Sequence, residues 1–599
     1  MDGGAGGGGG AGPEGALHRA GARAGEALGL VVLPGAGVGL AAPGGALPLA
    51  GDPAALVAHL EELLHPRWTW WSAAGTAGPL VAAGVHLARC HDVAAAHRLL
   101  AGGGRDDPGA AWAAAHGLPE PAAPAPGRAA AHGTGLLDLD GALEGGSGPL
   151  ERDGRLAAGW VDGRALGPEV EPAERLRRAA RWAELALRTA AAQRRALEGA
   201  ADPRPRPAPP ALALQTAWSE SAAALLAVEL EVTGLPVDRA VAEAVVAAEV
   251  GPRPRGPAGE EAARAARDAP VHALLGPVDL RNPAAVLAAL RGLGFDLPDT
   301  RAWRLERLLG AHPAVEALLR WRRAERTATT YGYAWLERHV GADGRLRGAW
   351  SASDGGAGRM TAQAGLHSLP AELRPAVAAE PGHALVRADL GQVEPRVLAA
   401  VSGDAALAAA AREEDLYAPV AAALGVDRPT AKVAVLAAMY GQTSGAAGEA
   451  LRRMERAYPV ALAFLRAAEE DGRAGRDVRT WGGRRVRTGG GREARPDPPE
   501  EVLAARGRFA RNAVVQGAAA ELFKAWAATV RAGLAGAGAG GRVVLCLHDE
   551  LLLHVPQRGA GAAADLLRSA LADAARRWAG ERVRFVADVA VVRRWSEAK

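Results

Sequence analysis

One stretch near the C-terminus limits what this chain can fold into. Between Arg542 and Val555, two apolar runs of Val and Leu flank His548, Asp549 and Glu550. This pattern predicts a β-hairpin with the polar residues at its turn. Long apolar arms indicate burial on both faces, so an acid pair between them needs neutralisation, and a bound cation is the natural candidate. A solvated hairpin tip is the alternative, and a second carboxylate elsewhere would decide between the two.

The composition sets broad limits on the kind of protein. The 599 residues are enough for several domains. Lys and Arg number 70 against 67 acids, so the net charge of +3 neither demands nor excludes a nucleic-acid partner. Two cysteines, Cys90 and Cys546, exclude a disulfide framework and fit a reducing compartment. The uncharged stretch 27–51 is broken by prolines and glycines, so we expect strands there and no membrane span.

Shifts in composition and periodicity predict several parts along the chain. The N-terminal half begins with a Gly-rich tail that we expect to be disordered and continues with an α/β domain, a Pro-rich linker and a mostly helical region. From residue 341 onwards, strands return and frame a helical segment. The predicted borders are 1–27, 28–200, 201–210, 211–340, 341–415, 416–535 and 536–599.

A second acid stands at a strand-to-helix junction. The buried-type strand 383–389 ends at Asp389, and the run 392–400 after it has a helical pattern. A side chain at such a junction is exposed at the edge of a sheet. Asp389 is therefore a candidate partner for Asp549, although capping of the following helix would also explain an Asp at this position.

Cations and one aromatic residue share a face of a later helix. Asp427 is a suitable N-cap, and Arg428, Lys432 and Tyr440 follow at multiples of four residues. Two cations and an aromatic on one face suit a triphosphate and a base. The alternative is a solvated cationic face, which is common for such spacing.

Basic and amide side chains gather in two further segments. The stretch 480–487 combines arginines with glycines and Trp481, and the helical run 508–531 carries Arg508, Asn512 and Gln516 among alanines. Segments of this kind can follow a phosphate backbone, although each is a weak signal alone.

The order of these features resembles the plan of a polymerase palm interrupted by fingers. From about residue 211 to the end, the chain is similar to family A DNA polymerases of the bacterial DNA polymerase I type. Residues 389–396 with 402–404 resemble the first palm motif, 428–441 the fingers motif and 548–550 the second palm motif. Gly358-Arg359, Gly483 to Arg485, Asn512 and Gln516-Gly517 also fall into place.

The resemblance implies a fold and a set of partners. The fold would be α/β and multidomain, with an RNase H-like N-terminal domain (28–200) and a right hand. The thumb and a helical region would span 211–340, the palm 341–415 and 536–599, and the fingers with adjoining helices 416–535. The partners would be primer–template DNA and deoxynucleoside triphosphates. We expect a monomer in the bacterial cytoplasm, at the nucleoid.

The resemblance also implies roles for single residues. Asp389 and Asp549, with the backbone carbonyl of Leu390, would hold two Mg²⁺ ions for phosphoryl transfer, and Lys432 would assist departure of pyrophosphate. The residues implied to bind the nucleotide are Arg428, Lys432, Tyr440, Glu394 and Gln392. Those implied to bind DNA are Arg359, Arg484, Arg485, Arg508, Asn512, Gln516 and His548.

Several positions depart from the family pattern. Leu436 replaces an aromatic residue in the fingers, Leu390 a palm tyrosine, and Tyr417 a histidine. These changes touch the grip on the nucleotide rather than the metal ligands, so we expect an active but specialised enzyme. A protein that binds primer–template DNA without synthesis is an alternative.

The N-terminal region departs further from the pattern. The family carries a 3′–5′ exonuclease there, but the first strand of this chain has no Asp-x-Glu pair, and Trp182 stands near the place of the last acid. Cys90-His91-Asp92 could be a remnant of such a site. We expect a degenerate exonuclease-like domain and no 5′-nuclease domain, although a polymerase that retains proofreading is a further alternative.

Overall fold

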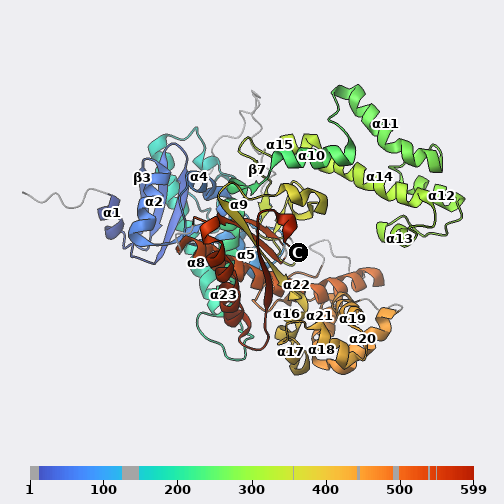
Figure 1. Ribbon diagram of the computed structural model, residues 1–599. Helices are drawn as coiled ribbons and strands as arrows, with labels where there is room; N and C mark the ends of the chain where they lie inside the picture. Colours follow the sequence, from blue (N-terminus) through green and yellow to red (C-terminus); the bar gives the residue numbers. More distant parts are fainter. Residues whose placement is uncertain are drawn as a thin grey trace, which may run out of the picture. The chain divides into compact units, whose positions relative to one another are not determined.

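The computed structural model describes most of the chain, which forms two compact units (Figure 1). The described residues are 13–123, 148–354, 356–441, 446–489, 498–536, 540–547 and 549–598. Unit 1 comprises Met1–Val232, Trp350–Thr361 and Val386–Ala590, and unit 2 comprises Thr233–Ala349, Ala362–Leu385 and Val591–Lys599. The chain passes from one unit to the other within strands β10 and β15. Each unit is described by itself below.

The N-terminal sheet of unit 1 has five strands in the order β3-β2-β1-β4-β5. The strands are β1 (Ala27–Leu33), β2 (Gly37–Ala42), β3 (Gly45–Ala50), β4 (Arg67–Trp70) and β5 (Arg89–Asp92). The first three are antiparallel, whereas β1, β4 and β5 run parallel. The uncharged stretch 27–51 therefore forms strands, as expected. Among the residues that the structure describes, no helix combines the length and apolar character needed to cross a membrane.

Helices pack closely on this sheet. Helix α8 (Pro172–Glu198) approaches β1 so closely that a Cβ at Gly29 would lie 2.6 Å from the carbonyl oxygen of Ala183. Helix α2 (Pro53–Leu64) begins after Asp52, whose side chain accepts a hydrogen bond of 2.9 Å from the Ala55 amide. The shorter helices are α3 (Ala73–Thr76), α4 (Gly78–Ala82), α5 (Val93–Ala101), α6 (Pro108–Ala115) and α7 (Ala158–Val161).

The prediction that residues 1–27 form a disordered tail is wrong for the last part of this segment. Residues 1–12 lie outside the described residues, but helix α1 spans Pro13–Arg19. Leu17 is 2% exposed and belongs to the same apolar cluster as Leu28 and Leu30 of β1. This burial anchors a segment whose glycine content alone predicts disorder.

A long helix joins the N-terminal sheet to the rest of unit 1. Helix α9 spans Leu212–Thr233, at the start of the predicted helical region 211–340. Its Leu225 and Val228 pack into the cluster that contains β1 and β2. Because of this packing, most of α9 belongs to the same unit as the N-terminal sheet.

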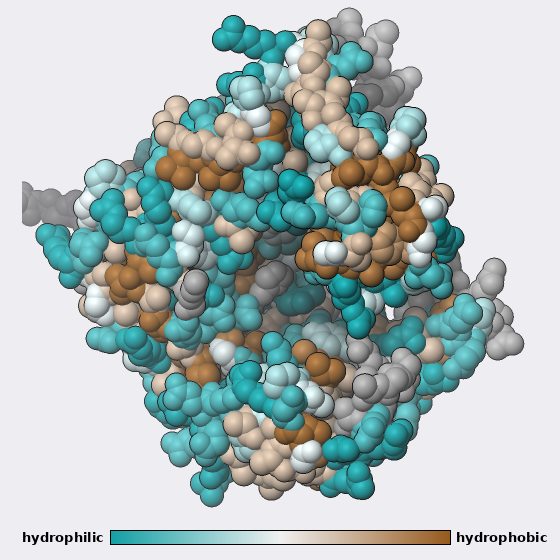
Figure 2. All heavy atoms as spheres, turned by 45° about the vertical axis from the view of Figure 1, so that its right-hand side comes forward, coloured by the Kyte–Doolittle hydropathy of each residue, from teal (hydrophilic) through white to brown (hydrophobic). Residues whose placement is uncertain are grey.

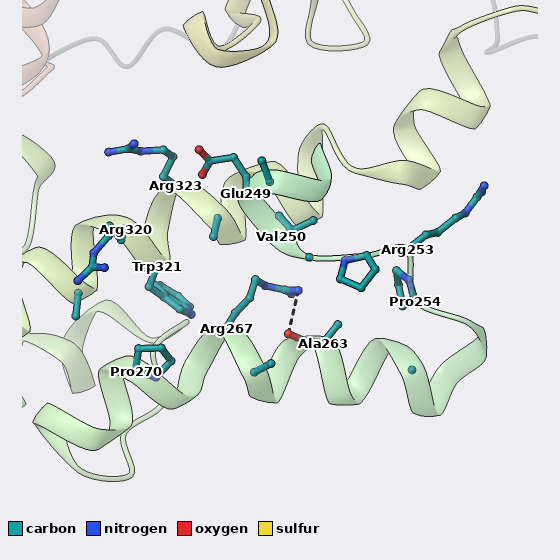
Figure 3. A pocket seen from close by; sticks show the side chains of 17 residues that line it. Glu249, Val250, Arg253, Pro254, Ala263, Arg267, Pro270, Arg320, Trp321 and Arg323 are labelled. Carbon is teal, nitrogen blue, oxygen red and sulfur yellow. Dashed lines mark hydrogen bonds between the residues drawn. The ribbon is translucent and has the colours of Figure 1, made fainter. Parts of the chain in front are cut away.

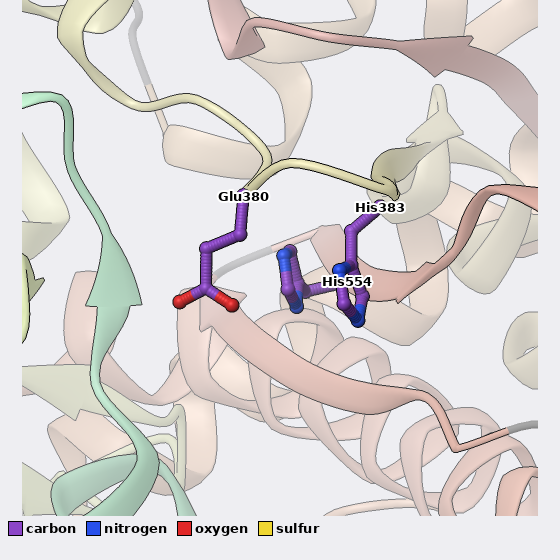
Figure 4. A group of neighbouring side chains, drawn as sticks. All are labelled: Glu380, His383 and His554. Atoms are coloured by element: carbon purple, nitrogen blue, oxygen red, sulfur yellow. The ribbon is translucent and has the colours of Figure 1, made fainter.

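A second sheet contains the predicted hairpin. Its order is β13-β14-β10-β15, with β13 (Arg542–Leu547), β14 (Glu550–Pro556), β10 (His383–Gly391) and β15 (Val586–Val592). Leu547 pairs with Glu550, which confirms the predicted hairpin. Figure 4 shows His383 at the start of β10 and His554 within β14. Helices α22 (Glu500–Gly536) and α23 (Ala560–Ala579) accompany this sheet in unit 1.

Six helices follow β10 along the chain. They are α16 (Val393–Ser402), α17 (Ala405–Ala410), α18 (Tyr417–Leu424), α19 (Arg428–Tyr440), α20 (Ala446–Ala457) and α21 (Pro459–Arg473). Asp427 caps α19 as predicted, since its side chain accepts from the Thr430 amide at 2.9 Å. These helices and α22 share one large apolar cluster that includes Val397, Val435 and Leu465. The cluster fixes α19 against its neighbours.

Unit 2 is largely helical. Its helices are α10 (Arg239–Val250), α11 (Gly256–Leu275), α12 (Pro283–Gly292), α13 (Ala302–Glu306), α14 (Pro313–Thr330) and α15 (Tyr333–His339). Val271, Leu318 and Trp321 lie in its core, and the indole of Trp321 donates to Asp268 at 2.7 Å. Figure 3 shows a cleft of about 730 Å³ between α11, α14 and the end of α10, with Arg267 and Arg320 on its walls.

The remaining strands are two residues long. They are β6 (Leu235–Pro236), β7 (Arg345–Leu346), β8 (Trp350–Ser351), β9 (Thr361–Ala362), β11 (Val478–Arg479) and β12 (Arg485–Val486). Residues 345–351 therefore contain two short strands separated by a loop. On the face shown in Figure 2, hydrophilic residues cover most of the surface and the apolar patches are separate.

A buried group of charges holds α9, α22 and the segment after β11 together. Glu220 of α9 accepts from Lys524 of α22 at 2.7 Å and lies 2.6 Å from a guanidinium nitrogen of Arg484. The three side chains are at most 4% exposed. Because both cations share the carboxylate of Glu220, the stability of this cluster depends on that residue.

We expect Glu220→Ala to lower the free energy of unfolding by about 3–5 kcal/mol, because two buried cations lose their partner. Urea denaturation followed by tryptophan fluorescence measures the change. The control is Glu455→Ala, which removes a largely exposed ion pair with Arg466 and should change stability by no more than about 1 kcal/mol. Equal effects of the two substitutions would contradict the role of the cluster.

Candidate active site

The face of β10 carries alternate polar residues. Arg387, Asp389 and Gly391 are partly exposed, whereas Val386, Ala388 and Leu390 are buried. Side chains two residues apart on a strand point to the same side, so Arg387 and Asp389 share one face. The strand continues through Gly391, and Gln392 occupies the N-cap position of α16 with φ of 56°. Asp389 therefore does not cap the helix, which excludes that alternative.

Strand pairing brings the two predicted metal-binding acids together. The Leu390 amide donates a hydrogen bond of 2.8 Å to the backbone carbonyl of Asp549. The end of β10 thus lies directly beside the turn of the β13–β14 hairpin. Asp389 therefore lies close to the hairpin acids, as the predicted metal site needs.

An arginine links the acids of three strands. The guanidinium of Arg387 donates to Asp389 at 2.6 Å and to Glu550 at 2.7 Å. A third nitrogen lies 3.8 Å from Asp588 of β15. One cation is therefore surrounded by carboxylates on this face of the sheet.

The surroundings of Asp389 and Asp549 disfavour their ionised forms. Burial raises the pKa of Asp389 to about 6, and the neighbouring charge of Asp549 adds to this rise. Burial also raises the pKa of Asp549, and Glu550 adds to it. Carboxylate oxygens that repel one another are the ligands that hard cations such as Mg²⁺ prefer. The residues therefore fit the predicted Mg²⁺ site.

The first residue of α19 is paired with an acid. Arg428 donates to the two carboxylate oxygens of Asp415 at 2.6 and 3.2 Å. Gln392 donates to the same carboxylate at 2.7 Å, and its side-chain oxygen accepts from the Leu416 amide at 2.8 Å. Lys432, one turn further along α19, is exposed. Gln392 thus connects the segment that follows Asp389 with Arg428.

The last residue of α19 reaches helix α16. The Tyr440 hydroxyl donates to Glu394 of α16 at 3.0 Å. Burial raises the pKa of Tyr440, Glu394 adds to this rise, and a hydrogen bond with Gln516 opposes it. Three residues predicted to bind nucleotide or DNA therefore meet at this point.

The other predicted DNA-binding residues have different surroundings. Arg359 is half-exposed beside Asp354, Arg485 pairs with Asp477 at 2.7 Å, and Arg508 is exposed. Asn512 is partly exposed on α22, one turn before Gln516. His548 lies outside the described residues. Arg484 is buried, and its guanidinium pairs with the buried carboxylate of Glu220. It therefore does not reach the surface.

Three further residues lie at the candidate site and received no role from the sequence: Arg387, Asp588 and Asp415. Glu550 was predicted as a hairpin acid, and the structure adds its ion pair with Arg387. The strand period could have placed Arg387 beside Asp389, since the two are separated by one residue. Nothing local marks Asp415 as a partner of Arg428, because the pair forms only when α18 and α19 pack together.

The N-terminal sheet offers little that could bind a metal. Asp92 is buried and accepts from the amides of Ala73 and Ala95 at 2.6 and 2.8 Å and from the Trp70 indole at 3.1 Å. It therefore caps α5. Where the resemblance places an acid, Trp182 packs against Trp71 with the rings tilted by 33° and their centroids 4.6 Å apart.

A sheet that gathers carboxylates beside a helix with exposed cations is typical of enzymes that transfer phosphoryl groups with divalent ions. Residues 294–597 match DNA polymerase family A. Because the match covers half of the sequence, the chain belongs to this family, which confirms the resemblance.

Curated relatives are bacterial DNA polymerases. The thermostable DNA polymerases I of Thermus filiformis and Thermus caldophilus are 30% and 32% identical over 49% and 45% of this chain. DNA polymerase I of Chloroflexus aurantiacus is 28% identical over 50% of this chain. The matched parts make up 38%, 35% and 34% of these relatives, so the chain matches little more than a third of their length.

A solved structure supports the fold over nearly the whole chain. It is the POL domain of Pol1 from M. smegmatis in complex with DNA primer-template and dNTP. The identity is 20%, the TM-score is 0.65, and the match covers 97% of both chains. The mixed α/β, multidomain architecture is therefore that of a DNA polymerase I polymerase domain.

The raised pKa of Asp389 predicts a pH-dependent stability. Its ordinary pKa is 3.8 and its folded pKa is about 6. Between these values the folded protein holds a proton that the unfolded chain releases, so without divalent ions stability falls as pH rises through this window. We expect Asp389→Asn to match the wild type near pH 4 and to melt roughly 2–5 °C higher above pH 6.

Thermal unfolding in EDTA between pH 4 and 8 measures this difference. Asp573→Asn, on the exposed side of α23, serves as the control and should show no such trend. A variant at position 389 that melts below the wild type above pH 6 would refute the repulsion between the acids.

Proposed function

We propose that this protein is a template-directed DNA polymerase that adds deoxynucleoside triphosphates to a primer 3′-hydroxyl. The observation that carries the proposal is the pairing of β10 with the hairpin, which sets Asp389 beside Asp549. Membership of DNA polymerase family A supports the same activity. The acids are remote in the sequence, and phosphoryl transfer with two metal ions requires them at one place.

The palm residues would hold the ions. Asp389 and Asp549 would ligate two Mg²⁺, with the backbone carbonyl of Leu390 as a further ligand. When bound, these ions supply Lewis acidity and neutralise the charge of the reacting phosphates. Asp389 is fixed on β10 and Asp549 at the hairpin turn beside it, so the two carboxylates would orient the reacting groups without a large rearrangement.

The fingers helix would bind the triphosphate. Arg428 would exchange Asp415 for phosphate oxygens, because a guanidinium binds both kinds of anion through the same paired hydrogen bonds. Lys432 lies one turn further on the helix and would neutralise the departing pyrophosphate. Gln392 and Arg428 both donate hydrogen bonds to Asp415. A move of Arg428 to the phosphate would therefore also change the contacts of Gln392.

The end of the fingers helix would select the nucleotide. Tyr440 would stack near the templating base, and Glu394, which its hydroxyl contacts, would exclude a 2′-hydroxyl. The residues that we propose to contact DNA are Arg359, Arg485, Arg508, Asn512, Gln516 and His548. We leave Arg484 out of this set because it is buried with Glu220.

We expect Asp389→Ala and Asp549→Ala each to reduce dNTP incorporation by roughly a thousandfold or more, because either change removes an ion ligand. Extension of a labelled primer on a template with Mg²⁺ measures the rate. Asp573→Ala is the matched control and should extend at the wild-type rate. Wild-type activity in either palm variant would refute the proposal. An inactive wild type that binds primer–template DNA would favour the alternative, a protein that binds this DNA without synthesis.

We also propose that the N-terminal domain is a degenerate, RNase H-like relative of a 3′–5′ exonuclease. The strand order β3-β2-β1-β4-β5 supports the scaffold. The use of Asp92 as a helix cap and the Trp71–Trp182 contact support the loss of catalysis.

We expect no proofreading from this domain. A primer with a mismatched 3′ end, incubated with the wild type and Mg²⁺ but without dNTPs, should keep its length over hours. Gel electrophoresis of the labelled primer measures this. Trimming that persists in Asp389→Ala would show a nuclease site separate from the palm and would overturn the proposal.

A further inference from the structure

A guanidinium lies among the carboxylates of the palm. The Arg387 side chain is 12% exposed and donates to Asp389 at 2.6 Å and to Glu550 at 2.7 Å. It also lies 3.8 Å from Asp588, whose side chain is 63% exposed. The arginine therefore contacts acids of β10 and β14 directly and faces one of β15.

These contacts occupy oxygens that a metal ion would need. Each hydrogen bond engages a lone pair of Asp389 or Glu550, and the same lone pairs coordinate divalent cations. Arginine keeps its proton at all ordinary pH values, so it cannot yield its place by losing its charge. A cation that enters the site must displace the guanidinium from Asp389.

The arginine also separates like charges. Asp389, Glu550 and Asp588 lie around one cation, and without a counter-ion their repulsion would push the side chains apart. With Arg387 in place, Asp389 and Glu550 each accept a hydrogen bond from the same guanidinium. The ion-free site is therefore already ordered.

Building on the proposed polymerase function, we propose that Arg387 is a positioning residue that orders Asp389 and Glu550 in the ion-free protein and weakens divalent-cation binding until a nucleotide arrives. The triphosphate brings additional oxygen ligands, which favour the cation over the guanidinium. Glu550 and Asp588 then remain as partners for the displaced arginine. Ion binding and nucleotide binding thereby become coupled.

The test measures the binding of Mn²⁺ to the DNA-free protein. Electron spin resonance reports the concentration of free Mn²⁺. We expect Arg387→Met to bind Mn²⁺ about tenfold more tightly than the wild type, because a neutral side chain of similar length leaves the carboxylates to the ion. Arg387→Lys should bind about two- to threefold more tightly, since one ammonium does not match the paired geometry. Arg576→Met removes an exposed arginine on α23 and should leave the affinity unchanged.

A nucleotide supplies a second readout. Addition of dNTP should tighten Mn²⁺ binding more in the wild type than in Arg387→Met, because the variant has no competing cation. Asp389→Asn in the Arg387→Met background should lose the gain in affinity, which places the ion at this site. Equal Mn²⁺ affinity of the wild type and a folded Arg387→Met would overturn the inference.

Circular dichroism identifies the variants that fold. If Arg387→Met does not, Arg387→Gln takes its place with the same expected gain, and if neither folds, an unchanged affinity of Arg387→Lys overturns the inference. Primer extension by the wild type separates the two proposals. A wild type that does not extend primers at saturating Mn²⁺ refutes the polymerase, whereas an active wild type with unchanged affinities refutes only the role of Arg387.

Discussion

The hydrogen bond from the Leu390 amide to the Asp549 carbonyl sets the register on which the candidate site depends. Side chains on a strand alternate between faces, so a slip of one residue would turn Asp389 toward the buried side and expose Ala388. The hairpin pairs Leu547 with Glu550 and leaves Asp549 at its turn, level with the end of β10. One backbone contact thus aligns acids from two distant segments.

Apolar packing keeps this register. Val386, Ala388 and Leu390 are buried on one face of β10, and Leu551 to Leu553 of the neighbouring β14 are buried as well. A shift would expose these side chains and bury Asp389 or Arg387, at a cost of several kcal/mol for each buried charge. The apolar face therefore supplies the stability that allows repelling acids on the other face.

Local signals predicted much of the site. The hairpin, the helix capped by Asp427 and the strand that carries Asp389 follow from periodicity and turn residues within short segments. Ion pairs across the fold gave no such signal: Arg484 resembled a surface cation until Glu220 of α9 proved to be its partner. Glycine content likewise predicted disorder for Pro13–Arg19, because the buried contacts of Leu17 are made by distant strands.

The charged groups of the site neutralise one another in the same way at both ends. Arg387 stands among acids that suit a metal ion, and Asp415 stands against an arginine that suits a phosphate. The second pair is half-exposed, so solvent screens it and its rupture costs little. On the proposed function, bound ions and nucleotide would therefore replace ion pairs within the protein by pairs between the protein and the ligands. Because Asp389, Glu550 and Arg428 already have partners, the ion-free protein can keep both clusters folded and ordered before any ligand binds.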